Sequence, residues 1–248
     1  MPLFGRSPSR EPDLKAVAEA LAATFEAGAA DQDGRIRVED LLSAAAAVCG
    51  ESCIVAAGEF DPATHSFVPG SPVLSDRVNG ILVNDAQDWD GAGTSVFGII
   101  RSAILSHGYA SDDFPPIADP IRRFVESLGS AGEGPGSGWG FIALSVPEAN
   151  RPRVQPLRAA FELRAPVRKV LQDHGVARAD WPSTCAAALV IELTRVRQAI
   201  EPGVAVRIVL ETVNGMAKTA PMTERHLSEA DAGRAGPFTA EGQEEAEP

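Results

Sequence analysis

The sequence predicts a mainly α-helical protein, a multi-helix globular bundle with at most a small β element near residues 139–146. Three observations lead to this prediction. Apolar residues recur every three or four positions through most of the chain, which is the period of a helix. Pro, Gly, Ser and Asp stand at the ends of these periodic segments, where helices start and stop. The best run for an extended strand is 139–146, which has no obvious partner.

Two helices are predicted in the first quarter of the chain. The first follows Pro12 and Asp13 and ends near Gly28, with an apolar stripe formed by Leu14, Val17, Leu21 and Phe25. The second is rich in alanine and continues past Gly50 towards Ala57. Its helical period is carried by Val38, Leu41, Leu42, Ala45, Val48 and Cys49. Both helices are therefore predicted to pack closely.

The segment Asp31–Ile36 between these helices shares part of the spacing of a calcium-binding loop. With Gly34 at the sixth position, Ala29 occupies the first position and Asp40 the twelfth. A calcium loop of this kind needs an oxygen ligand at the first position and a bidentate Glu at the twelfth. We therefore predict a turn with acids that cap the following helix.

The middle of the chain alternates loops and short helices. Residues 59–72 contain three prolines and are predicted to be an irregular loop. Ser75 is predicted to cap a short helix whose inward residues are Val78, Ile81 and Leu82. The run 94–106 is apolar on nearly every side and ends at His107 and Gly108, so we expect a buried, central helix there.

A further helix is predicted from Asp119 and Pro120 to Gly129, with Ile121, Phe124, Val125 and Leu128 inward. The glycine-rich residues 130–138 follow and mark a possible boundary inside the domain.

The last third of the chain is predicted to be helical as well. Residues 154–171 read as two helices separated at Pro166, because proline removes a helical hydrogen bond. Trp181 and Pro182 begin a strong helix that extends to Ile200. Residues 204–213 match both a helix and an alternating strand, and we favour the helix.

Composition predicts one globular region between two flexible ends. The 248 residues are divided into a flexible N-terminus (1–12), a helical domain (13–223) and an acidic flexible tail (224–248). No uninterrupted apolar run is long enough for a membrane span, and the first residues lack the apolar core of a signal peptide. With only three cysteines, the expectation is a cytoplasmic protein that uses neither a membrane nor a disulfide framework.

Charge is distributed unevenly along the chain. The net charge of −12 disfavours binding to nucleic acid. From Glu224 onward, seven acidic residues stand against two arginines, which gives the tail a charge of −5. Opposite in sign is a basic stretch from Arg151 to Arg178. Its candidate partner-binding residues are Arg158, Arg164, Arg168 and Lys169, and the expected partner is a protein or the acidic tail of the same chain.

The densest group of possible metal ligands is formed by Asp85, Asp88 and Asp90. Three carboxylates in a short loop could bind a divalent cation or supply a general base. Carboxylates just before a helix also act as simple caps. A second group, Glu59, Asp61 and His65, matches no closed metal motif. No nucleophile-elbow, zinc-protease, paired Cys-x-x-Cys or dinucleotide motif is present with the correct flanks.

Two hypotheses for function follow. The first is a non-catalytic helical interaction or regulatory protein, without a cofactor, that uses the basic stretch. The alternative is an enzyme or ligand-binding protein that uses the acidic loop from Asp85 to Asp90, with a divalent metal as its only cofactor.

Overall fold

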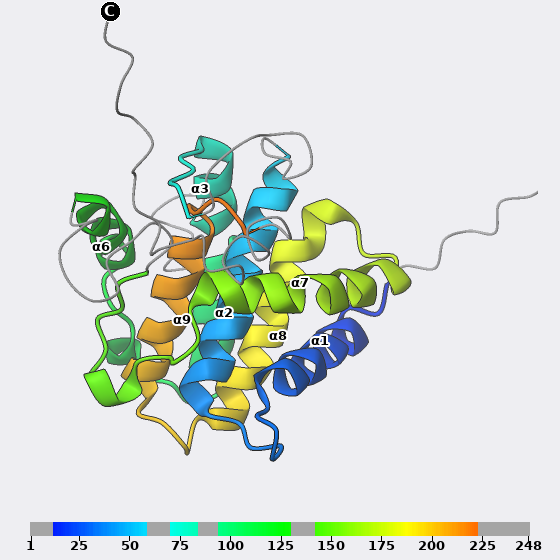
Figure 1. The fold of residues 1–248 in the computed structure, drawn as a ribbon, viewed down its shortest axis with the longest axis horizontal. Coiled ribbons are helices and arrows are strands. Elements are labelled where there is room, and N and C mark those ends of the chain that lie inside the picture. Colours follow the sequence, from blue (N-terminus) through cyan, green and yellow to red (C-terminus); the bar gives the residue numbers. More distant parts are fainter. Residues whose placement is uncertain (1–11, 59–69, 84–93, 130–141, 223–248) are drawn as a thin grey trace, which may run out of the picture.

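The computed structural model describes residues 12–58, 70–83, 94–129 and 142–222 of the chain (Figure 1). Within these ranges it has eight α-helices and three short 3-10 helices but no β-strand, so the predicted mainly helical class is confirmed. The α-helices are α1 (Leu14–Ala29), α2 (Val38–Ala57), α3 (Asp76–Leu82), α5 (Val96–Ser106), α6 (Ala118–Gly129), α7 (Pro156–Asp173), α8 (Trp181–Val196) and α9 (Pro202–Met216). The 3-10 helices are η1 (Ser111–Asp113), η2 (Glu148–Asn150) and η3 (Arg178–Asp180).

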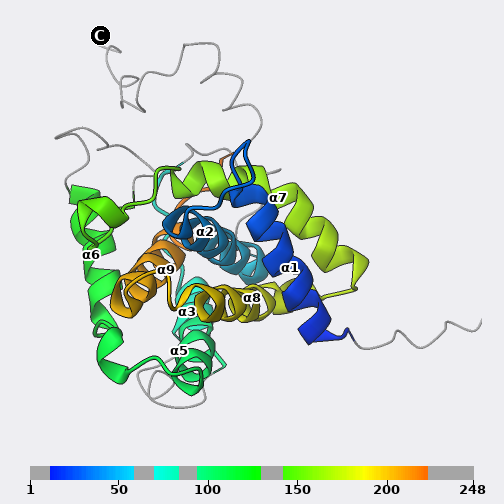
Figure 2. The same ribbon diagram turned by 90° about the horizontal axis from the view of Figure 1, so that it is seen from below.

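Helices α2 and α9 form the centre of the molecule. Figure 1 places α2 between α9 and α8, with α7 crossing next to it, and Figure 2 shows α2 beside both helices. In α2, 15 of 20 residues are buried, and in α9 13 of 15 are buried. The predicted central helix at 94–106 is instead α5, which packs mainly on α8 and leaves several of its residues only half-buried. That prediction of position was wrong, because an apolar composition does not determine which helix acquires neighbours on every side.

The close contact between α2 and α9 depends on a glycine. A Cβ atom built on Gly50 would lie 2.6 Å from the carbonyl oxygen of Val213 and 2.9 Å from the amide nitrogen of Ala217. Both atoms belong to the backbone and cannot rotate away as a side chain would. The spacing of the two central helices therefore requires the absence of a side chain at position 50.

We expect Gly50→Ala to lower the free energy of unfolding by about 1 to 3 kcal/mol, because α2 and α9 must move apart. Gly80→Ala is the matched control, since Gly80 is an exposed residue of α3 and its added Cβ would meet no atom within 4 Å. The control should gain up to about 1 kcal/mol from helix propensity. Urea unfolding of both variants measures the difference, and equal behaviour would contradict the proposed backbone contact.

Helix α7 continues through Pro166 as one helix, so the predicted division into two helices was wrong. Pro166 lies on the exposed side of α7, where water can hydrogen-bond the carbonyl group that proline leaves without its helical donor. Leu163 and Val167 on either side of it are buried in the core. Packing against α1 and α2 along the helix thus outweighs the local cost of the proline.

Residues 142–146 do not form a β-strand, although the sequence favoured extended structure for 139–146. Ile142 and Val146 are buried against the helices, and no strand among the described residues lies beside them. An alternating apolar run needs a neighbouring strand for its backbone hydrogen bonds. Here the segment follows the helical surface, with Ile142 packed closely against Gly215 of α9.

Most of the local signals for helix ends agree with the structure. Asp13, Ser75 and Ser95 cap α1, α3 and α5 by accepting a backbone N–H from the first turn. The segment 204–213 is helical, as favoured from its sequence. The segment Asp31–Ile36 is a turn, in which the carboxylate of Asp31 accepts the backbone N–H groups of Asp33 and Arg35. The prediction that its acids cap the next helix was wrong, because these bonds stay within the turn and the N-cap of α2 is Arg37, without a side-chain cap hydrogen bond.

The first turn of α2 anchors the segment that leads into α7. Arg37 donates to the carbonyl groups of Ala149 and Arg151, each at 2.7 Å. Asp40 accepts the backbone N–H of Arg153 at 2.6 Å, and Glu39 accepts the side-chain amide of Asn150 at 2.9 Å. The acids in the first turn of α2 therefore fix the segment that leads into α7, a role that a local sequence pattern does not reveal.

Helix α2 is, among the described residues, the one helix long and apolar enough to cross a membrane by length and composition. Of its most apolar window, 83% is buried inside the protein, as in the core helix of a globular fold. One large hydrophobic cluster extends from α1 to α9 and includes α2, α5, α7 and α8. The predicted flexible N-terminus, apart from Pro12, the possible boundary at 130–138 and the predicted tail 224–248 lie outside the described residues.

Candidate functional site

Helix α7 carries the four residues proposed for partner binding, and they lie in two different environments. Arg158 and Lys169 are exposed, and each forms an ion pair one turn further along the helix, with Glu162 at 2.8 Å and with Asp173 at 2.6 Å. Arg158 and Glu162 are four positions apart, the spacing at which helical side chains of opposite charge can pair. Such exposed pairs contribute only a few tenths of a kcal/mol, about 0.3 to 0.5. Both cations therefore remain at the surface, where a partner can reach them.

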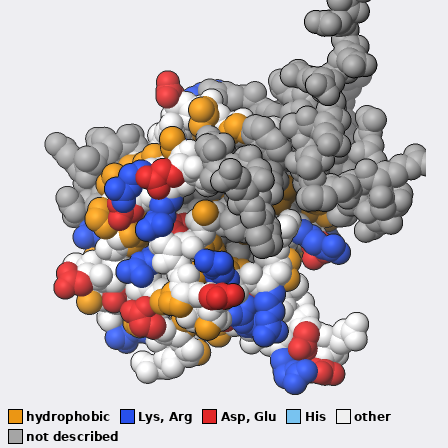
Figure 3. Space-filling model, turned by 60° about the vertical axis from the view of Figure 1, so that its left-hand side comes forward, with side chains coloured by type: hydrophobic (Ala, Val, Ile, Leu, Met, Phe, Trp, Pro, Cys, Tyr) orange, Lys and Arg blue, Asp and Glu red, His pale blue; other side chains and the backbone are white. Residues whose placement is uncertain are grey.

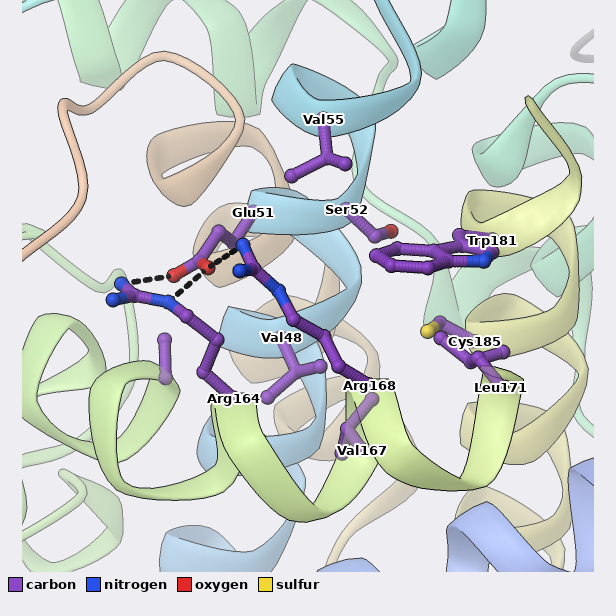
Figure 4. A pocket seen from close by; sticks show the side chains of 11 residues that line it. Val48, Glu51, Ser52, Val55, Arg164, Val167, Arg168, Leu171, Trp181 and Cys185 are labelled. Atoms are coloured by element: carbon purple, nitrogen blue, oxygen red, sulfur yellow. Dashed lines mark hydrogen bonds and ion pairs between the residues drawn. The ribbon is translucent and has the colours of Figure 1, made fainter. Parts of the chain in front are cut away.

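Arg164 and Arg168 instead converge on Glu51 of α2 (Figure 4). Arg164 binds this carboxylate in a bidentate manner, with Nε 2.5 Å from Oε1 and Nη2 2.9 Å from Oε2. Arg168 approaches Oε1 with Nη2 at 3.7 Å. The side chains of Glu51 and Arg164 are 7% and 15% exposed, whereas that of Arg168 is 36% exposed. Arg164 is thus mainly an internal residue, and Arg168 lies at the edge of the site.

The guanidinium group of Arg164 has a third contact, with the end of the described chain. Its Nη1 donates to the carbonyl oxygen of Met222 at 2.7 Å. It also stacks over the ring of Phe161, with 5.3 Å between the guanidinium carbon and the ring centroid. One arginine of α7 therefore ties α2 and residue 222 to the same point.

Beside this ion pair, α2, α7 and the start of α8 enclose a small pocket (Figure 4). Its volume is about 20 Å³, room for roughly one or two water molecules. Typical small-molecule pockets are roughly 300 Å³ or larger. Trp181 forms one wall and donates its indole N–H to the carbonyl of Val176 at 3.1 Å, so its position is fixed. The pocket as it stands does not accommodate a substrate-sized molecule.

Cys185 also lines this pocket, and it belongs to a group of three buried thiols with Cys49 and Cys53. Burial raises the pKa of the Cys185 thiol to about 12, although the nearby Ser52 hydroxyl lowers it. Burial likewise raises the pKa values of Cys49 and Cys53. Since the thiolate is the reactive form, these cysteines act as small core residues.

A second polar group lies on one side of α9 and was not identified from the sequence. Glu211 accepts the backbone N–H of Ser145 at 2.6 Å and the Ser145 hydroxyl, and lies 3.5 Å from Arg123 of α6. Burial raises the pKa of Glu211, while the bonds from Ser145 and the charge of Arg123 lower it. Asn214 donates to the carbonyl of Pro120 at 3.0 Å. These contacts hold α6 and residues 142–146 against α9.

Lys218 continues this polar group and has an unusual environment. It is 5% exposed, donates to Asn214 at 2.8 Å and lies 5.9 Å from the ring centroid of Phe124. Burial lowers the pKa of Lys218 to about 8, and no carboxylate of the described segments forms an ion pair with it. The signal in the sequence was the spacing of Glu211, Asn214 and Lys218, three and four positions apart, which places two polar residues on one side of α9 and the third just after its end.

The acidic candidates lie outside the described residues. These are Asp85, Asp88 and Asp90 and the second group Glu59, Asp61 and His65. Across residues 12–58, 70–83, 94–129 and 142–222, no group of three or more His, Cys, Asp or Glu side chains is arranged to hold a metal ion.

Glu51 is the residue of the site that sequence reasoning missed. It is the single charged residue in the run Leu41–Ala57, which is otherwise apolar except for the small polar residues Ser43 and Ser52. A carboxylate in the middle of a core helix requires a cation from another element. Arg164 and Arg168 are one turn apart on α7 and therefore reach it together.

Comparisons with protein-family models, with curated proteins and with solved structures find no match for this chain. The fold itself defines a mainly α-helical, multi-helix globular protein. Its function is therefore inferred from the residues and contacts described above.

Proposed function

We propose that this chain is a non-catalytic helical interaction protein that binds an acidic segment of a protein partner on α7. We define the α7 basic surface as Arg158, Arg168 and Lys169, with Arg164 beneath it. The observation that carries the proposal is that, with Arg164 neutralised by Glu51, α7 presents three cations and two acids, a surface charge of +1, in a chain whose net charge is −12. A local surface of opposite sign attracts acidic segments and disfavours basic ones.

The rigidity of α7 supports the same proposal. The buried ion pair between Arg164 and Glu51 and the contacts before α7 hold this helix in place. A surface held in place in advance loses less conformational entropy when it binds a partner. The small volume of the neighbouring pocket and the raised pKa of its one thiol, Cys185, favour a binding role for this region over catalysis.

The spacing of the cations defines the kind of segment that would fit. Arg158 and Lys169 are three helical turns apart on one side of α7, a distance of about 16 Å at 1.5 Å per residue. An extended peptide covers this distance in about five residues. We therefore expect an extended segment with acidic residues about five positions apart, and with a further acid near Arg168.

Helix α6 offers a matched control residue outside α7. On the face seen in Figure 3, acidic and basic side chains are interspersed. Arg122 of α6 is 61% exposed and forms an ion pair with Asp119 at 2.7 Å, which resembles the pairing of Lys169. The charge reversals Lys169→Glu and Arg122→Glu therefore change the net charge equally but at different places.

The test uses a fluorescent peptide of about 12 residues with glutamates five positions apart, and a control peptide with glutamines instead. We expect the acidic peptide to bind in fluorescence anisotropy, and to bind several-fold more weakly after Lys169→Glu but not after Arg122→Glu. Raising the salt from about 20 mM to about 500 mM should weaken binding. Equal affinity for both peptides, or equal effects of both reversals, would remove α7 from the proposed role.

A further inference from the structure

The chain is held next to the α7 basic surface at the point where its acidic segment is about to begin. Met222 is 7% exposed, and its carbonyl oxygen accepts a hydrogen bond from Arg164 Nη1 at 2.7 Å. Just before it, Ala220 exchanges backbone hydrogen bonds with Gly70 and Ser71, each at 2.8 Å. The course of the chain up to residue 222 is therefore determined by α7 and by residues 70–73.

Chain length places the first acid of the tail near the cations of α7. Glu224 is two residues beyond Met222, so its Cα atom lies within about 7 Å of that of Met222. Arg168 is one turn from Arg164 along α7, about 6 Å along the helix axis. Glu229 and Asp231 follow within reach of the rest of the helix. Notably, Glu224 and Glu229 are five positions apart, the spacing that matches Arg158 and Lys169.

We propose that residues 224–248 bind the α7 basic surface of their own chain and compete there with the acidic partner. This inference rests on the proposed function and adds its regulation. The tail brings a charge of −5 to a helix whose surface charge is +1. Because the tail is tethered at Met222, its effective concentration at α7 is on the order of millimolar. Even a weak acidic segment therefore competes, and a partner must exceed it in affinity or concentration.

The first test compares the full chain with a variant of the same length whose tail is partly neutralised, Glu224→Gln/Glu229→Gln/Asp231→Asn. We expect the acidic probe peptide to bind this variant about threefold or more tightly than the unchanged chain at low salt. The difference should disappear at about 500 mM salt. Equal affinities at low salt would overturn the competition by the tail while leaving partner binding on α7 intact.

The second test measures the tail directly and needs no partner. A spin label on Ser228→Cys is selective, because Cys49, Cys53 and Cys185 are buried, with pKa values raised by burial. At low salt we expect the label to broaden amide signals of α7 more than those of α6, and to lose this preference after Lys169→Glu. Equal broadening of both helices would overturn the inference, even if the probe peptide binds.

Discussion

Replacing Arg164 with methionine is expected to lower the free energy of unfolding by about 3 kcal/mol. The substitution leaves the carboxylate of Glu51 7% exposed, with Arg168 3.7 Å away as the remaining cation of this ion-pair group. It also removes the hydrogen bond to the carbonyl of Met222. A buried charge that has lost its bidentate partner is much more costly than an exposed one. Urea unfolding at neutral pH measures the loss.

The double variant Glu51→Met/Arg164→Met tests the cause of this loss. Removing both charges should recover most of the stability, because a buried ion pair adds little beyond what an apolar pair of similar size provides. The double-mutant cycle should therefore show strong coupling. Arg158→Met is the matched control, since its pair with Glu162 is exposed, and we expect a change below about 0.5 kcal/mol. Additive losses for the two single variants would contradict a coupled, buried pair.

The second large effect is expected at Glu192 of α8, whose side chain is fully buried. Arg195 donates to its Oε1 at 3.1 Å, and Oε2 has no hydrogen-bond partner in the described part of the chain. Burial raises the pKa of Glu192 from 4.5 to about 7, the charge of Glu26 adds to this rise, and Arg195 opposes it. The carboxyl group is thus held preferentially in its neutral form.

The sign of the pH dependence follows from this raised pKa. Between pH 4.5 and about 7 the folded chain keeps a proton that the unfolded chain has lost. The contribution of Glu192 to stability is therefore fully present below pH 4.5 and is lost as the pH rises to about 7. A pKa shift of this size corresponds to about 3 kcal/mol.

Glu192→Gln removes this titration while it keeps the shape of the side chain. We expect the variant to exceed the unchanged protein in stability by about 3 kcal/mol at pH 8, and by less than half of that near pH 5.5. Chemical unfolding across this range measures the difference curve. Glu162→Gln on the exposed side of α7 is the control and should change stability by a few tenths of a kcal/mol, about 0.3 to 0.5. A gain that does not vary with pH would contradict the raised pKa.

The candidate site was predicted from the sequence only in part. The basic stretch in the sequence contains α7, and the spacing of Arg158 and Glu162 on a helix is that of an i to i+4 ion pair. The partner of Arg164 could not be predicted in this way, because Glu51 is 113 positions away along the chain. The hydrogen bond from Arg164 to Met222 could not be predicted from the sequence either, since it depends on where α9 ends relative to α7. Contacts between distant residues require the packing of the whole fold.

The sequence by itself determined the helical class and most of the helix ends. The acid Asp13 at the start of α1, the cap Ser75, the start of α8 at Trp181 and the period of α9 are signals that act within one or two helical turns. Backbone hydrogen bonds in a helix join residues four positions apart, so short stretches of sequence carry this information.

Only the tertiary structure decided which helices are central, whether α7 passes Pro166, and whether residues 142–146 pair as a strand. Each of these depends on neighbours that lie far away in the sequence. Helix α9 and Gly50 of α2 place α2 at the centre, whereas α5, which is more uniformly apolar, remains at the side. The free energy gained by burying apolar surface does not depend on the direction of the contact, so many arrangements of the helices would be stabilised. Close packing of the side chains then favours one of these arrangements.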